Sequence, residues 1–190
     1  MTSNSLIEEA FIEHEIVPDA ISKPPREILN IVYDGGHRVG LGATLTPRQV
    51  KDQPVVSWNA ENGALYTLAM IDPDAPSRKD LERKEIEHWL IINIPGKEIE
   101  KGETLSSYFG AGPSPNTGLH RYIFLIFKQP TRLSDSSRGG TTYEEMSKNR
   151  RRYIKEFIEK HRLGAPVAGN FFQAEYDDYV GEMYRKMGRG

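Results

Sequence analysis

The chain has 190 residues, a formal net charge of −2 and no cysteine. This composition excludes disulfides, thiolate metal sites and cysteine nucleophiles, and the charge gives no general footprint for nucleic acid. The length favours one domain over residues 1–190, large enough to bury a core without cross-links.

Residues 1–26 are expected to form a variable N-terminal extension with a short helix. Ser5 and Glu8 make a capping-box pattern, apolar residues follow at helical spacing from Leu6, and Pro18 ends the segment. The segment lacks the basic start of a secretory signal, and no stretch approaches the roughly 18 apolar residues of a membrane span. We therefore expect a soluble, cytoplasmic protein. We also expect a monomer, because no apolar helix face is left over for a partner.

Turn residues divide most of the remaining chain into short strands, over 28–33, 39–50, 54–58, 65–71, 88–94, 121–128 and 170–176. The runs 65–71, 88–94 and 121–128 are nearly continuously apolar, which predicts central strands. Strands do not alternate with helices, so a parallel doubly wound sheet is not expected. The pattern predicts a mostly-β protein, a two-sheet antiparallel sandwich with peripheral and C-terminal helices.

Two further helices are expected near the C-terminus. Thr142 and Glu145 make a second capping box, and apolar residues then share one helical face as far as His161. Basic side chains from Lys148 to Lys155 are interpreted as a solvated face, the alternative being a patch for peripheral contact with an anionic membrane or an acidic partner. The last helical face runs from Tyr179 to Met187.

Polar groups follow the ends of the central strands. Two prolines flank Asp74, and because each removes a backbone donor, we expect the first strand to stop at Asp72. His88 and His120 begin the next two apolar runs, and a loop rich in glycine and proline over 108–120 precedes His120. If these groups converge, the imidazoles and the backbone N–H groups of the loop suit an anion such as phosphate. Tyr122 would share a strand face with His120.

Each histidine alone is better explained as a hydrogen-bonded strand end, and the case for a pocket rests on the coincidence of two histidines, a strand-end acid and a glycine-rich loop. Catalysis has little support, because no G-x-S-x-G occurs and Gly110-x-Gly112 is not followed by Lys-Ser/Thr. Asp72 and Asp74 with the two histidines show no metal-binding spacing. We therefore expect no catalytic residue, metal or cofactor, and a hydrolase using Asp72 is the weakest hypothesis.

Longer motifs carry a resemblance to a known family. Asp72-Pro73-Asp74-Ala75-Pro76-Ser77-Arg78 with His88, and Gly118-Leu119-His120-Arg121-Tyr122, resemble two signatures of the phosphatidylethanolamine-binding protein family. Residues 165–169 and 173–179 resemble the closing segment of its animal branch, which includes the Raf kinase inhibitor proteins. Glu87 departs from the pattern, since some animal members have a second histidine there.

The resemblance implies a β-sandwich with a small pocket for anionic head groups. The family's pocket residues correspond here to Asp72, Pro76, His88, Gly112, Pro113, His120 and Tyr122. The resemblance also implies that the C-terminal helix closes one side through Tyr184 and Met187, and that the Ala75-Pro76 bond is cis.

The leading hypothesis is a non-enzymatic protein that binds phospholipid head groups such as phosphatidylethanolamine, or other phosphate-type anions, and modulates signalling. The alternative is a regulator that inhibits a kinase of the Raf/MAPK type or a serine protease through the same pocket. Asp72 supports a zwitterionic ligand: its carboxylate would repel a bare phosphate, but could accept an ammonium or orient a histidine.

Overall fold

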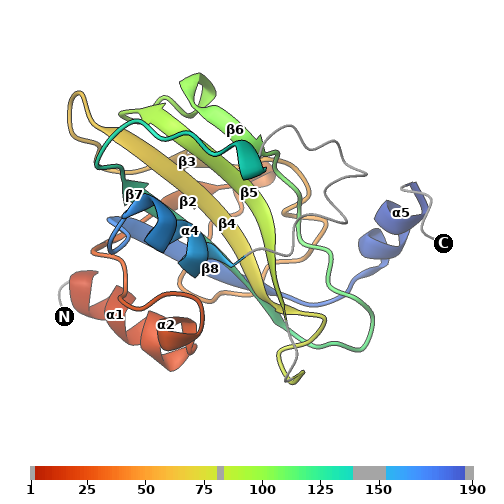
Figure 1. The fold of residues 1–190 in the computed structure, drawn as a ribbon. Helices are drawn as coiled ribbons and strands as arrows, with labels where there is room; N and C mark the ends of the chain where they lie inside the picture. The colour runs from red at the N-terminus through yellow and green to blue at the C-terminus, as the bar shows by residue number, and fades with distance from the viewer. Residues whose placement is uncertain (1–2, 81–83, 139–152, 187–190) are drawn as a thin grey trace.

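The computed structural model describes residues 3–80, 84–138 and 153–186 (Figure 1). A six-stranded sheet has the order β1-β8-β7-β4-β5-β6, and a two-stranded sheet pairs β2 with β3. The strands are β1 (Glu27–Ile28), β2 (Asn30–Val32), β3 (Val55–Ser57), β4 (Leu65–Ala75), β5 (Lys84–Pro95), β6 (Glu103–Ser106), β7 (His120–Lys128) and β8 (Ala168–Ala174). The α-helices are α1 (Ser3–Glu13), α2 (Ile16–Asp19), α4 (Ile154–His161) and α5 (Asp178–Lys186), and the 3-10 helices are η1 (Asp34–Gly36), η2 (Ile99–Lys101) and η3 (Ser136–Arg138).

The pairing is antiparallel throughout the described part except between β1 and β8, which run parallel. The predicted β-rich chain with mostly antiparallel strands and peripheral helices is therefore confirmed. The second sheet contains only two described strands, which is smaller than the sequence pattern suggested.

Alternating residues of the central strands bury two cores, one on each face of the large sheet. On one face, Leu68 and Met70 of β4 pack in one cluster with Ile31 and Val56 of the small sheet. On the other face, Ala69 and Ile71 belong to a cluster that includes Phe11 of α1 and Phe157 of α4. Figure 1 shows the same arrangement, with the helices α1, α2 and α4 on one side of the large sheet and the small sheet on the other.

Several predicted strand boundaries are wrong, including those of the last strand, which was expected over 170–176 and is observed as Ala168–Ala174. The strand expected over 28–33 is divided, because Ile28 pairs with β8 in the large sheet while 30–32 pair with β3. Residues 39–50 form no strand: Leu41 and Gly42 turn with φ of 40° and 95°, and the segment pairs with β8 only through an isolated bridge at Thr44–Gln173 and a few hydrogen bonds around it. The strand β6 lies within the stretch that was expected to be loop.

The strand β4 continues to Ala75 instead of stopping at Asp72. Its regular pairing with β7 ends at Ile71–Ile123, and its register with β5 shifts between Asp72 and Ala75. Pro73 stands in this irregular part of the ladder, so its missing N–H interrupts no regular pairing.

The helices differ from expectation at their ends. α1 begins at Ser3, so Ser5 lies inside the helix and is not its cap. The described part of the long helix is α4, and the capping box at 142–145 and most of the basic cluster lie outside the described residues. None of the helices in the described ranges is long and apolar enough to cross a membrane.

Candidate functional site

The antiparallel topology brings the predicted polar groups to one end of the large sheet. That end contains the last residues of β4 and β8 and the first residues of β5 and β7. Asp72, His88 and His120 all lie there, and all three are buried. The loop between β6 and β7 and the helix α5, which follows β8, border the same end (Figure 1).

His88 enters the site through a β-bulge. Met70 pairs with Trp89 and Ile71 pairs with Glu87, so His88 has no partner on β4. A bulge of this kind breaks the alternation of faces and re-aims a side chain. The His88 ring therefore meets Tyr122, at 5.2 Å between ring centroids, on the same face of the sheet as Trp89. The prediction that His88 opens its strand is wrong, because β5 begins at Lys84.

Glu87, which departs from the family pattern, faces the other way. Its partner across the ladder, Ile71, belongs to the helix-covered core, and directly opposed residues share a face. The buried Glu87 carboxylate accepts a hydrogen bond from the Ser106 hydroxyl. The sequence difference therefore adds an acid on the face opposite the His88 ring.

Asp72 orients His120. Its Oδ2 lies 2.8 Å from His120 Nδ1, while its Oδ1 accepts a hydrogen bond from the Asp74 backbone N–H at 2.7 Å. On the other side of the ring, His120 Nε2 lies 2.9 Å from Thr117 Oγ1. Both ring nitrogens are thus held by protein groups, and the carboxylate acts as the orienting partner of a histidine.

The hydrogen bonds of Thr117 determine the charge of His120. The Thr117 hydroxyl lies 2.7 Å from the Ser114 carbonyl oxygen, which can only accept, so the hydroxyl proton is donated there. Thr117 Oγ1 must then accept from His120 Nε2–H, and the Asp72 carboxylate accepts from Nδ1–H. This pattern requires the doubly protonated imidazolium. Burial disfavours that charge, but the hydrogen bond and charge of Asp72 outweigh it and raise the pKa of His120 above 6.5.

Tyr122 connects the two histidines. Its ring stacks between His120 and Phe172, with centroid distances of 6.4 and 5.0 Å, and His88 approaches it edge-on. Its hydroxyl is buried and makes no regular hydrogen bond in the described structure, although the Asp72 carboxylate and the Gly112 backbone lie close enough to influence its pKa. Burial, followed by the charge of Asp72, raises the pKa of Tyr122 well above 10, so the hydroxyl stays neutral and keeps its proton. A buried donor without a partner is suited to a ligand oxygen.

The loop before β7 and the helix α5 close the site. The Phe109 carbonyl accepts a hydrogen bond from His88 Nδ1 at 2.8 Å, which fixes that ring. The Tyr184 hydroxyl of α5 donates to the Gly112 carbonyl at 2.6 Å. Pro113 is buried beside Gly112, and Met187 lies outside the described residues. Sequence patterns did not indicate the Phe109 carbonyl or Thr117, because both act through local loop geometry.

Pro76 borders this end of the sheet with an exposed ring, and its backbone contributes to the raised pKa of His120. The expected cis bond between Ala75 and Pro76 is present. A hydrogen bond from Ser77 Oγ to the Thr117 carbonyl, at 3.1 Å, ties this segment to the loop before β7.

Asp74 does not belong to the site. Its carboxylate accepts hydrogen bonds from Arg121. Arg121 lies two residues before Ile123 on β7 and so shares its face of the sheet, the face of the helix-covered core. Among the described residues, no group of three or more histidine, cysteine, aspartate or glutamate side chains could hold a metal ion.

Replacement of Gly110 by alanine should destabilise the fold more than the same change at Gly112. A Cβ at Gly110 would lie 2.8 Å from the Val50 carbonyl oxygen, so backbone would have to move. A Cβ at Gly112 would meet the flexible end of Met183 at 2.7 Å, which can turn aside. We expect urea denaturation to show a loss of about 1–3 kcal/mol for Gly110→Ala. Equal losses for the two variants would contradict this explanation.

Comparisons with known proteins identify relatives over most of the chain. A family model for phosphatidylethanolamine-binding protein matches residues 35–172. A Drosophila melanogaster protein named "Putative odorant-binding protein A5" is 37% identical over 175 residues, covering 92% of this chain and 83% of the relative.

Two solved structures are also similar. The solution structure of CG7054 is 40% identical with a TM-score of 0.70, covering 90% of this chain and 97% of that one. A crystal structure of carboxypeptidase Y inhibitor complexed with the cognate proteinase is 26% identical with a TM-score of 0.75, covering 92% and 97%.

Proposed function

Because this chain belongs to the phosphatidylethanolamine-binding protein family, we propose that it binds a phosphate-type anion without catalysing its turnover. The ligand is the phosphate of a phospholipid head group or of a related small phosphoester. The binding site is formed by Asp72, His88, His120 and Tyr122, with the loop 110–113 and Tyr184 beside them. At this site the anion would lie next to the His120 imidazolium and the buried hydroxyl of Tyr122.

The observation that carries the proposal is the unpaired hydroxyl of Tyr122. A buried donor without a partner costs free energy, and a ligand oxygen that accepts its hydrogen bond would recover it. The adjacent His120 is held as a cation by its bonds to Asp72 and Thr117, which favours a negatively charged ligand. The Asp72 carboxylate is already bonded to His120, so the ion pair presents little net charge to repel a phosphate.

Calorimetric titration with glycerophosphoethanolamine tests the proposal. We expect a dissociation constant in the micromolar to millimolar range, about 4–8 kcal/mol of binding free energy. Tyr122→Phe should weaken binding by about 0.5–1.5 kcal/mol while the free energy of unfolding does not fall, because the removed hydroxyl makes no regular hydrogen bond. His88→Ala should weaken binding by about 1.5–3 kcal/mol if its contact with the ligand is charge-assisted.

The matched control is His37→Ala, which removes a partly buried histidine outside the site. It should bind as the wild type does. Unchanged affinity in a folded Tyr122→Phe variant would place the ligand elsewhere. Release of phosphate or glycerol that disappears in His88→Ala would overturn the non-enzymatic part of the proposal.

A second candidate function is inhibition of a partner enzyme. It is favoured by the likeness to a structure whose title describes an inhibitor bound to its cognate proteinase. Here the same site would accept a partner loop or a phosphorylated side chain. Assays of a serine carboxypeptidase and of a Raf-type kinase, each with and without saturating glycerophosphoethanolamine, separate the two functions. Inhibition that the small ligand relieves would support the regulator.

A further inference from the structure

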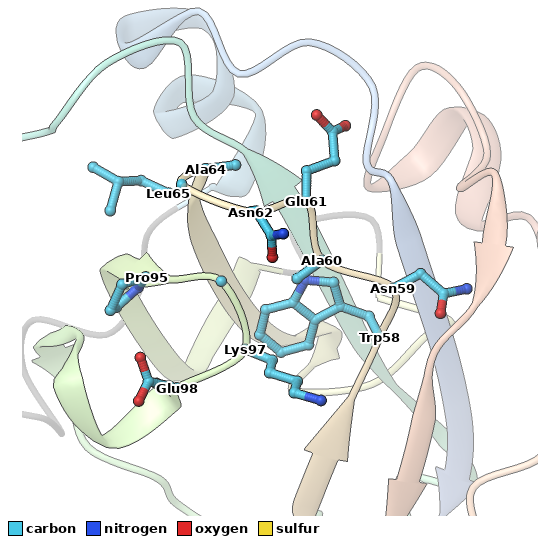
Figure 2. Close-up of a pocket in the computed structure, with 12 residues that line it drawn as sticks. Trp58, Asn59, Ala60, Glu61, Asn62, Ala64, Leu65, Pro95, Lys97 and Glu98 are labelled. Carbon is cyan, nitrogen blue, oxygen red and sulfur yellow. The ribbon is translucent and has the colours of Figure 1, made fainter.

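A hollow lies at the end of β4 opposite to Asp72. Its volume is about 580 Å³, within the range of small-molecule sites. One wall is the segment 58–65, which joins β3 to β4, and the other is the turn 95–98, which follows β5 (Figure 2). A hydrogen bond from Gly96 N–H to the Ala64 carbonyl, at 2.9 Å, links the two walls.

Trp58 gives this hollow an unused donor. The side chain is nine-tenths buried, at 9% exposure, and its Nε1–H has no hydrogen-bond partner in the described structure. An edge-to-face contact with Tyr66, at 5.6 Å between centroids, holds the ring in place. Figure 2 shows the nitrogen edge of the indole turned toward the Ala60–Asn62 segment. Buried donors are nearly always paired, so this group points to a ligand that accepts a hydrogen bond.

The wall around Trp58 carries little net charge. The Glu61 carboxylate is paired with Lys128 at 2.5 Å, and the Glu98 carboxylate is paired with Lys101 at 2.5 Å. Lys97 is the other charged residue among those that line the hollow, all of which are described. A strongly charged ligand would therefore find no buried counter-ion, in contrast to the site at His120.

The remaining lining groups suit a hydroxylated molecule. The Asn62 side chain points from its loop into the hollow (Figure 2), and an amide both donates and accepts hydrogen bonds. A hydroxyl group also does both, so it can satisfy an amide and an indole N–H together. Ala60, Leu65 and Pro95 provide apolar contact for C–H groups.

We propose that this hollow is a second ligand site, which takes a neutral hydroxylated small molecule of about monosaccharide size, with Trp58 Nε1–H donating to one of its oxygens. The proposal does not depend on phosphate binding at the other end of the sheet. The segment 59–63 covers the indole nitrogen, so a ligand oxygen reaches Nε1–H when this segment moves aside.

Titration of the isotopically labelled full chain, followed through the indole N–H resonances, tests the proposal. The chain has two tryptophans, and a Trp89→Phe variant assigns the resonance of Trp58. The probes are glucose, galactose, N-acetylglucosamine, myo-inositol and sucrose. We expect at least one to shift the Trp58 resonance saturably below about 50 mM, which is weak millimolar binding. The Trp89 resonance should not move.

Asn62→Ala should weaken that binding roughly 2- to 10-fold, the effect of one lost hydrogen bond. The matched control Asn30→Ala removes an exposed amide outside the hollow and should change nothing. Failure of all five probes to saturate the shift would overturn the proposal. A saturable shift caused by inorganic phosphate instead would overturn the neutral ligand class. Equal binding by wild type and Asn62→Ala would overturn the role of the Asn62 amide in the site.

Discussion

Asp74→Asn is expected to lower the free energy of unfolding by about 3–5 kcal/mol, the cost of removing one partner from a buried ion pair. Arg121 is fully buried, and its side chain donates to both carboxylate oxygens of Asp74, at 2.9 and 2.7 Å. It also donates to the His14 carbonyl at 2.7 Å and to Asp19 at 3.0 Å. The asparagine keeps the volume but leaves the guanidinium charge without its main partner.

The same guanidinium ties the N-terminal helices to the sheet, because His14 lies between α1 and α2 and Asp19 is the last residue of α2. Urea denaturation measures the loss of stability, and hydrogen exchange should show faster opening of 14–19. The control is Glu61→Gln, which breaks an exposed ion pair with Lys128 and should leave the unfolding midpoint unchanged within error. Similar midpoints for the two variants would show that the buried pair is not a main support of the fold.

Affinity for glycerophosphoethanolamine should fall at least roughly 10-fold as pH rises through the raised pKa of His120, above 6.5. Below that pKa the Asp72–His120 pair is neutral overall, and above it the pair carries one negative charge next to the ligand. A phosphodiester is the right probe, because its own charge does not change in this range. Calorimetry at several pH values, from mildly acidic to alkaline, measures the change.

The variant His120→Gln isolates this effect, because glutamine has no proton to lose there. Its affinity should be low and nearly independent of pH. Folding stability should follow the same sign: a raised pKa in the folded state adds stability that is present below 6.5 and is lost as pH rises through the folded value. Parallel pH profiles for wild type and variant would rule out His120 as the titrating group.

Local sequence determined much of the framework. The apolar runs specified the three central strands, since residues buried on both faces must be apolar along the whole strand. Asp72 lies near the end of one of these strands and His120 at the start of another, and this order was sufficient to predict that the two side chains meet. Their antiparallel pairing places them at the same end of the sheet, and Asp72 and His120 lie in direct contact.

Other parts of the site were decided by tertiary structure. Strict alternation would place His88 on the face opposite Trp89, and only the bulge in β5 puts both on the face where His88 meets Tyr122. The charge of His120 depends on Thr117 giving its proton to the Ser114 carbonyl, which follows from the fold of one loop.

The sequence by itself determined which strands form the centre of this protein and which acid and histidine meet at their ends. Burial on both faces and strand polarity leave a local record in the order of apolar and polar residues. The orientation of His88, the charge of His120 and the unpaired donors of Tyr122 and Trp58 were decided only by the tertiary structure. Bulges, loop hydrogen bonds and unpaired groups depend on which residues distant in the chain face one another, and no local pattern specifies that.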